Sequence, residues 1–154
     1  MKSVHRILAT LFASIGLLAT ALAQEHGTRE DAKALADAAV AHIKSAGADK
    51  SFEDFTKDKA AWTKKDIYVF VMDLDGNMKA HGANEKLVGK NNLGLRDKNG
   101  KEFVKDLVAM AAGKGDGWVD YEWVNPVSKK VEPKSSYVER VPGANLFVGV
   151  GIYR

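Results

Sequence analysis

Residues 67–77 carry the sequence Ile-Tyr-Val-Phe-Val-Met-Asp-Leu-Asp-Gly-Asn. The first six residues are apolar at both odd and even positions, which is typical of a strand that is covered on both faces. The next five residues have turn chemistry, and residues 78–81 begin a returning strand. This stretch therefore predicts a hairpin at the centre of an antiparallel sheet.

Three further strands are predicted in the last third of the chain, where apolar and polar residues alternate. They span residues 118–124, 130–141 and 146–153, and Asn-Pro and Pro-Gly turns join them. Pro133 interrupts the middle strand and predicts a β-bulge or an edge position, because proline cannot donate a ladder hydrogen bond. Together with the hairpin, these segments predict five antiparallel strands.

A long helix is predicted ahead of the hairpin, with Thr28 as its N-cap and Gly47 as its terminator. Its apolar stripe recurs at three- and four-residue spacing and consists of Ala32, Leu35, Ala36, Ala39, Val40 and Ile43. Because half of these residues are alanines, the helix can approach its partner closely. We expect that the same helix can also pair with its twin in a homodimer.

Shorter helices and one long connection complete the predicted fold. A second helix is expected to begin at Ser51 and to bury Phe52 and Phe55. Residues 82–100 hold many Gly, Asn and Lys, and connections of that length in a compact domain are often functional. A short helix over residues 103–111 follows. A leading helix, inserted helices and an antiparallel sheet give the fold class α+β.

The first 23 residues have the pattern of a secretory signal peptide. Lys2 and Arg6 give a positive start, residues 7–22 are apolar, and the segment ends in Ala-Leu-Ala. Cleavage after Ala23 would leave residues 24–154 as one domain. The alternative is an uncleaved anchor, but about 16 apolar residues are fewer than the roughly 20 that a membrane-spanning helix needs. We therefore expect a periplasmic or secreted protein.

The composition excludes several classes of site. The chain has 154 residues, 45% of them hydrophobic, which is enough for one sizeable core. It has no cysteine, which excludes a disulfide framework, a thiolate zinc site, a cysteine nucleophile and covalently attached haem. The net charge of +3 falls to about +1 without residues 1–23, and no basic stripe marks a nucleic-acid surface.

No motif for a metal site or for catalysis is present in the sequence. No two of the four histidines have metal-ligand spacing; they are His5, His26, His42 and His81. The acidic turn of the hairpin lacks the spacing and the terminal glutamate of a calcium loop. Asp120 and Glu122 share one strand face, where paired carboxylates can serve glycoside hydrolysis. A solvated strand face explains this pair more simply, so we predict no metal, no cofactor and no enzymatic activity. The alternative is an enzyme that uses the Asp120 and Glu122 pair.

An aromatic face on the first of the three late strands is the strongest candidate for a binding pocket. Tyr121 and Trp123 share this face, and a phenol there can hydrogen-bond a ligand. Lys134 and Tyr137 lie on the next strand, where strict alternation would put them on opposite faces. A bulge at Pro133 would let both enter one pocket. The alternative interpretation is that these aromatic residues simply form core.

Two other features are placed to border a cleft. His81 ends the returning strand just before the long connection. Gly149 and Gly151 share a face of the last strand and leave room for a close neighbour, which is either a helix or a ligand.

Six motifs, in order, resemble the type-two single Cache domain family over nearly all of residues 24–154. They are Asp75-Gly76-x-x-x-Ala80-His81, Leu87-Val88-Gly89-Lys90-Asn91, Asp97-x-Asn99-Gly100-Lys101-x-Phe103-Val104, Gly117-Trp118-Val119-Asp120-Tyr121-x-Trp123-x-Asn125-Pro126, Lys130-x-Glu132-Pro133-Lys134-Ser135-Ser136-Tyr137-Val138 and Val148-Gly149-x-Gly151-Ile152-Tyr153. The chain departs from the family's pattern at Gly82, where the family usually has proline.

The resemblance implies a PAS-like fold with a long N-terminal helix packed behind an antiparallel sheet. It also implies extracytoplasmic, non-catalytic binding of small molecules, often short carboxylates, by a sensing module of chemoreceptors or histidine kinases. The ligand-binding residues that it implies here are His81, Tyr121, Trp123, Lys134 and Tyr137. Lys134 would neutralise the carboxylate, the two phenols would hydrogen-bond it, and Trp123 would wall its apolar tail.

The last predicted strand ends next to Arg154, and no signalling segment follows it in this sequence. We therefore expect a soluble module without its own signalling domain, which either buffers an organic anion or presents it to a membrane receptor or kinase. The alternative is a structural or protein-interaction domain that has no small-molecule ligand.

Overall fold

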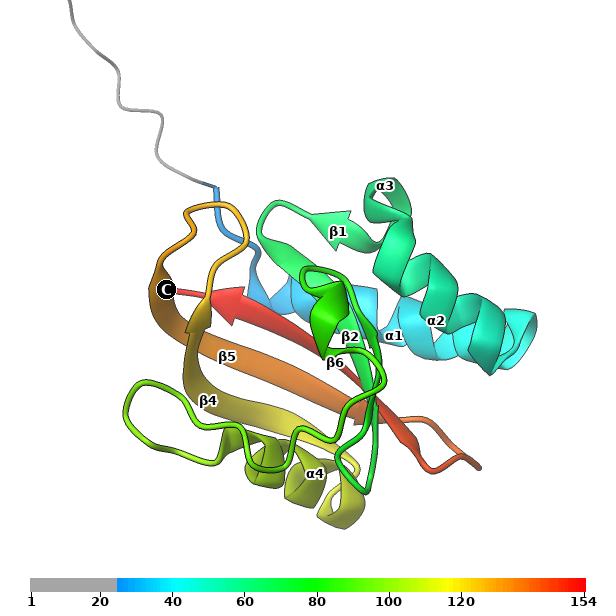
Figure 1. Ribbon diagram of the computed structural model, residues 1–154. Coiled ribbons are helices and arrows are strands. Elements are labelled where there is room, and N and C mark those ends of the chain that lie inside the picture. The colour runs from blue at the N-terminus through cyan, green and yellow to red at the C-terminus, as the bar shows by residue number, and fades with distance from the viewer. Residues whose placement is uncertain (1–24) are drawn as a thin grey trace, which may run out of the picture.

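The computed structural model describes residues 25–154 (Figure 1). The predicted signal peptide lies outside the described residues. The helices and strands follow one another as α1 (Arg29–Ala46), α2 (Ala48–Lys57), α3 (Lys59–Trp62), β1 (Thr63–Lys64), β2 (Ile67–Asp73), β3 (Met78–His81), the 3-10 helix η1 (Glu85–Leu87), α4 (Phe103–Gly113), β4 (Asp116–Val124), β5 (Val131–Arg140) and β6 (Leu146–Tyr153).

The sheet is antiparallel and runs in the order β1-β2-β6-β5-β4, and β3 pairs with β2. Every residue of β2 is buried, which confirms the central strand that its apolar pattern predicts. The prediction of five strands misses β1, which is only two residues long and pairs with the start of β2. A strand of two residues has no alternation that a sequence pattern could reveal.

Helix α1 begins and ends where its caps predict. Thr28 and Asp31 form a reciprocal capping box, and the N–H of Gly47 closes the last turn on the carbonyl of Ile43. The helix lies behind the sheet and buries its alanine-rich face against β5 and β6 (Figure 1). That stripe is therefore occupied by the sheet, and a dimer through α1 would have to use the opposite face.

Helix α2 begins three residues earlier than predicted. Gly47 has a φ of 87°, a conformation that ends α1 and lets α2 begin at Ala48. Ser51 is not its cap, because the Ser51 hydroxyl donates back to the carbonyl of Gly47 at 2.7 Å. Phe55 is fully buried as predicted, whereas Phe52 is only partly buried.

Strand β5 shows no bulge at Pro133. The pairing with β4 stays in register through Glu122 and Pro133, and the pairing with β6 starts at Lys134 and is equally regular. Side chains of β5 therefore alternate strictly between the two faces of the sheet. The irregularity lies instead in the pairing of β2 with β3, between Val71 and Met72.

The sheet separates two cores. Val69, Val71 and their neighbours pack toward α1 and α2, on the back of the sheet. Tyr68, Phe70 and Met72 point to the front, where α4 and the long connection between β3 and α4 cover them (Figure 1). The front core contains the predicted aromatic face of Tyr121 and Trp123.

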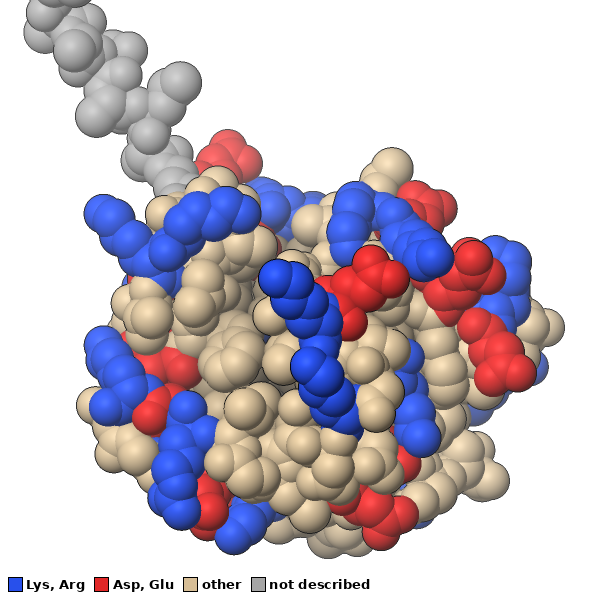
Figure 2. All heavy atoms as spheres, viewed as in Figure 1, with Lys and Arg blue, Asp and Glu red and all other residues tan. Residues whose placement is uncertain are grey.

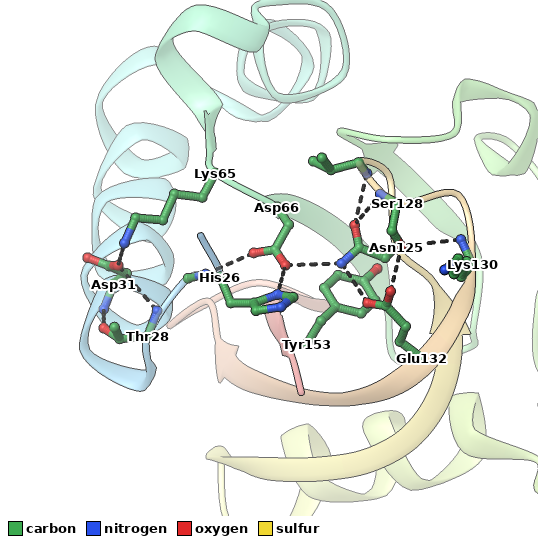
Figure 3. Close-up of polar contacts among 12 residues, drawn as sticks. His26, Thr28, Asp31, Lys65, Asp66, Asn125, Ser128, Lys130, Glu132 and Tyr153 are labelled. Carbon is green, nitrogen blue, oxygen red and sulfur yellow. Dashed lines mark hydrogen bonds and ion pairs between the residues drawn. The ribbon is translucent and has the colours of Figure 1, made fainter. Parts of the chain in front are cut away.

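A polar network fixes the first described residues to one end of the sheet (Figure 3). The carboxylate of Asp66, which is fully buried, lies 2.5 Å from Nδ1 of His26 and accepts from the backbone N–H of Gly27 at 2.8 Å. It also accepts from the side-chain amide of Asn125, which in turn donates to Glu132 at 2.8 Å. The network therefore ties the start of the domain to the β4–β5 connection.

Candidate functional site

Lys134 stands at the centre of the front core. It is 1% exposed, and among the described residues no other lysine or arginine is buried. Its Nζ lies 4.3 Å from the ring centre of Tyr68 and 5.0 Å from that of Tyr153. The rings of Phe70 and Tyr121 each lie at 5.8 Å. The ammonium group is therefore enclosed by aromatic faces, which attract a cation through their quadrupoles.

No carboxylate within residues 25–154 forms an ion pair with Lys134. The carboxylate of Asp66 acts on it only from a distance and opposes part of the effect of burial. Burial lowers the pKa of Lys134 to about 7, because the charged form loses its hydration. Near neutral pH, this lysine is thus poised between an ammonium ion without a counter-ion and a neutral amine.

A directed chain of hydroxyl groups leads away from Lys134. Its Nζ donates to the hydroxyl of Tyr68 at 2.8 Å, and that hydroxyl lies 3.3 Å from the hydroxyl of Tyr153. Tyr153 donates its hydrogen to the carbonyl of Val124 at 2.9 Å, so Tyr68 must be the donor to Tyr153. Burial raises the pKa of Tyr68 to about 12 and keeps both phenols protonated.

A small cavity lies beside Lys134. It has a volume of about 20 Å³, which suffices for a water molecule, and Phe70, Met78, His81, Phe103, Tyr121 and Trp123 are among the residues that line it. A larger outer hollow of about 330 Å³ adjoins it, and Lys129 lies at the edge of this hollow. His81 and Trp123 border both spaces, so they stand between the cavity and the outside.

His81 is buried in the position that the sequence analysis expects, facing this cavity. Its Nδ1 accepts from the backbone N–H groups of Ala83 at 3.2 Å and Asn84 at 2.9 Å. The ring hydrogen is therefore assigned to Nε2. Burial, together with the charges of Lys134 and Lys59, lowers the pKa of His81 to about 3. His81 is thus a neutral side chain that can donate from Nε2.

Tyr121 and Trp123 share one face of β4, as predicted, and both pack on Phe103 of α4. The rings of Tyr121 and Phe103 are stacked at 4.3 Å, and Trp123 is tilted against Phe103 at 5.2 Å. The hydroxyl of Tyr121 bonds that of Ser136 at 2.8 Å. Phe103 therefore holds both aromatic side chains in place against the cavity.

Tyr137 does not join the other four predicted site residues. Because β5 has no bulge, Tyr137 points to the back of the sheet, where its hydroxyl donates to Asp116 at 3.1 Å. Its ring packs on Trp118, and Lys33 of α1 lies over it at 5.1 Å. The structure thus brings together His81, Tyr121, Trp123 and Lys134, and it separates Tyr137 from them by the thickness of the sheet.

Several residues of this site were not predicted from the sequence. Tyr68 and Phe70 come from the front face of β2, and Tyr153 comes from the end of β6. Gly151 also belongs to the site: a Cβ atom built on it would overlap Cε of Lys134 and Oγ of Ser136. The neighbour for which Gly151 leaves room is therefore a lysine side chain, neither a helix nor a ligand.

Asp120 and Glu122, the carboxylate pair considered for catalysis, point to the back face of β4. Asp120 is exposed and its Oδ1 lies 3.5 Å from Nη2 of Arg154, whereas Oε2 of Glu122 forms an ion pair with Nζ of Lys98 at 3.0 Å. No cluster of three or more metal-ligating side chains occurs within the described residues. On the face seen in Figure 2, positive and negative side chains are interspersed, and a column of positive side chains with acidic ones beside it crosses the middle. None of the helices in residues 25–154 is apolar enough over a sufficient length to cross a membrane.

Residues 2–154 match the family model for single Cache domain 2. The sensor histidine kinase MctS of Rhizobium johnstonii is 35% identical over 89 residues, which cover 58% of this chain and 19% of that protein. The methyl-accepting chemotaxis protein McpP of Pseudomonas putida is 31% identical over 88 residues, which cover 57% and 16%. The chain therefore spans less than a fifth of the length of these curated relatives.

Solved structures show the same fold. A methyl-accepting chemotaxis protein from Vibrio parahaemolyticus has a TM-score of 0.67 and 27% identity, over 80% of this chain and 86% of that one. A periplasmic sensor domain of a chemotaxis protein has a TM-score of 0.65 and 29% identity, over 80% and 88%. A Cache chemosensory domain, solved for the structural basis of its carboxylic acid recognition, has a TM-score of 0.68 and 23% identity, over 80% and 91%. These likenesses confirm the predicted α+β Cache fold.

Proposed function

Because the chain belongs to the single Cache domain 2 family, we propose that it is a sensor domain that binds a short organic carboxylate beside Lys134. One observation carries this proposal: a fully buried lysine has no carboxylate partner among residues 25–154 and borders a cavity. An unpaired buried charge is costly, and a titratable group perturbed by burial beside a cavity is a candidate for a functional site. A ligand carboxylate would supply the missing counter-charge.

The contacts suggest a division of roles within the site. An ammonium group has three N–H donors, and Lys134 uses one of them on Tyr68, so two remain for a carboxylate. His81 offers a further donor at Nε2, and the hydroxyl of Tyr121 lies on the same side of the sheet. Trp123 and Phe103 would enclose the apolar part of the ligand.

The size of the cavity favours a short ligand. A volume of about 20 Å³ holds little more than a water molecule, so even acetate requires the front core to open. His81 and Trp123 separate the cavity from the outer hollow, and movement of these two side chains would create the room. Acetate, propionate, pyruvate and lactate are therefore better candidates than longer acids.

We propose that the domain works outside the cytoplasm. The relatives include a sensor kinase and a chemotaxis protein, and the fold includes a periplasmic sensor domain among its neighbours. In this proposal, residues 1–23 direct export, and the bound state is read by a membrane receptor or kinase. A homodimer would use the outward face of α1, because the sheet covers the alanine stripe.

Thermal unfolding of the purified protein against a panel of small molecules tests this function. A ligand at 100 times its Kd adds about 2.7 kcal/mol, which raises the unfolding midpoint of a domain of this size by roughly 8–10 °C. We expect such a rise with one or more of the short carboxylates, no rise with the matching amides, and no rise in the Lys134→Met variant. A flat panel for the folded wild type would instead favour the structural or protein-interaction alternative.

A further inference from the structure

Lys134 also has the surroundings of a nucleophilic amine. Its Nζ faces aromatic rings on several sides, has the Tyr68 hydroxyl at 2.8 Å and adjoins the cavity. A lysine amine attacks carbonyl groups only when it is neutral, and desolvation in an apolar pocket is one way in which proteins provide neutral amines. The low pKa of Lys134 is in keeping with this setting.

We propose that Lys134 forms a reversible imine with small 2-oxo acids, so that the domain recognises the ketone of its ligand as well as the carboxylate. This inference rests on the proposed function and narrows its ligand class. Acetate and lactate would bind only through their charge, whereas pyruvate would also bind covalently. The domain would thereby distinguish oxidised from reduced acids of the same length.

The bond changes balance without an external reagent. The lone pair of the amine attacks the ketone carbon, a C–N bond forms, and the carbonyl electrons move to oxygen, which takes a proton as the nitrogen gives one up. The resulting carbinolamine loses its hydroxyl group as water when a second proton arrives. Overall, the amine, the ketone and one proton from solvent give a protonated imine and one water molecule. The reverse reaction is hydrolysis.

The neighbours of Lys134 suit these proton transfers. The hydroxyl of Tyr68 is within hydrogen-bond reach of Nζ, so it can pass a proton between the nitrogen and the ketone oxygen. Its link to Tyr153 and the carbonyl of Val124 holds that hydroxyl in position. The protonated imine keeps the positive charge that Lys134 carries as an ammonium. The carboxylate of the same ligand can therefore neutralise it, with His81 donating from Nε2.

Reductive trapping is the direct test. The protein is incubated with pyruvate and sodium cyanoborohydride, which reduces an imine to a stable secondary amine, and the modified lysine is located by tandem mass spectrometry. We expect one N-carboxyethyl group, located on Lys134, with a yield that falls when excess acetate is present. The Lys129→Met variant is the matched control, since Lys129 is exposed at the outer hollow. It should be labelled as strongly as the wild type.

A second readout needs no reductant. Every cycle of imine formation and hydrolysis replaces the ketone oxygen with oxygen from water, so the folded protein should accelerate the exchange of pyruvate oxygen in water enriched in oxygen-18. The Lys134→Arg variant keeps the charge but cannot form an imine, and it should lose the acceleration.

The outcomes separate this inference from the proposed function. Binding of pyruvate, seen as a raised unfolding midpoint, with no adduct on Lys134 and no oxygen exchange would overturn the imine and leave carboxylate binding intact. Labelling spread over the exposed lysines would overturn it in the same way. An adduct on Lys134 without any stabilisation by acetate, propionate or lactate would support the imine and contradict carboxylate binding. Absence of both effects would reject both ideas.

Discussion

Lys134 occupies the space that a side chain at Gly151 would need. A Cβ atom added to Gly151 would overlap Cε of Lys134, and the two residues lie on adjacent strands of the sheet. The buried lysine and the glycine therefore form one structural unit.

Gly151→Ala should accordingly push Lys134 out of position. Overpacking of this kind costs about 1–3 kcal/mol, so we expect a lower unfolding midpoint. We also expect the affinity for the preferred carboxylate to fall by about tenfold or more. Calorimetric titration measures the affinity. Gly94→Ala is the control, because no other atom lies within 4 Å of its added Cβ. Equal affinities for the two variants would contradict the role of Gly151.

Lys134→Met should stabilise the ligand-free protein while it removes binding. At about 1.4 kcal/mol per tenfold change, a pKa of about 7 means that keeping Lys134 charged costs about 4–5 kcal/mol. Because the folded-state pKa already includes the attraction of the aromatic rings, we expect a gain of up to about 4–5 kcal/mol at pH 6, measured by urea unfolding. A loss of stability would show that the lysine is not under this penalty.

The same gain should shrink as the pH rises. The pKa of Lys134 is lower in the folded than in the unfolded state, so between about pH 7 and pH 10 the unfolded chain binds the extra proton. Stability of the wild type should therefore rise with pH across this window relative to Lys134→Met. The groups that face Lys134 are Tyr68, Tyr121, Tyr153 and His81, and none of them titrates there: the phenols have raised pKa values and His81 a lowered one. A constant difference between the two proteins would contradict this assignment.

Binding of acetate or propionate should take up a proton above neutral pH. A carboxylate favours the ammonium form of Lys134, so the amine that is neutral at pH 8 must become protonated on binding. We expect uptake of close to one proton at pH 8 and almost none at pH 6, with affinity falling about tenfold per pH unit above 7. Calorimetry in buffers of different ionisation enthalpy measures this uptake. Uptake that does not change between pH 6 and pH 8 would exclude Lys134 as the titrating group.

A matched pair of phenylalanine substitutions tests which tyrosine belongs to the site. Tyr121→Phe removes a hydroxyl from the front core and should weaken carboxylate binding severalfold, as the loss of about 1 kcal/mol implies. Tyr137→Phe removes a hydroxyl that points to Asp116 on the back of the sheet. Its ligand-induced rise in unfolding midpoint should equal that of the wild type. The reverse ranking would contradict the geometry.

The parts of the fold that were predictable are those with a local signal. Three features depend only on residues that lie close in the sequence. They are the strand β2, which is apolar at odd and even positions, the Thr28 capping box and the glycine at position 47 that ends α1. The start of α2 was not predictable, because its first turn is set by the unusual backbone of Gly47 rather than by the Ser51 side chain.

The candidate site was predictable only in part, because its contacts join distant segments. Tyr121, Trp123 and His81 follow from strand alternation and from the long connection. The contact of Tyr68 with Tyr153 joins residues 85 positions apart, and no sequence pattern reports it. The position of Tyr137 depended on whether Pro133 bulges the strand, and the regular register of β5 decided against it. The full burial of Lys134 was also unforeseeable, since lysine is almost never fully buried.

The proposed function depends on one contact, in which a buried Lys134 without a carboxylate partner among residues 25–154 receives the carboxylate of the ligand. Carbon-13 NMR of the lysine Cε groups measures this contact, with the Lys134 resonance assigned by its loss in Lys134→Met. We predict that in the free protein this resonance titrates with a pKa near 7, and that saturating propionate raises the pKa toward that of an ordinary lysine. A Lys134 that titrates like an exposed lysine in the free protein, or whose titration propionate leaves unchanged, would contradict the account.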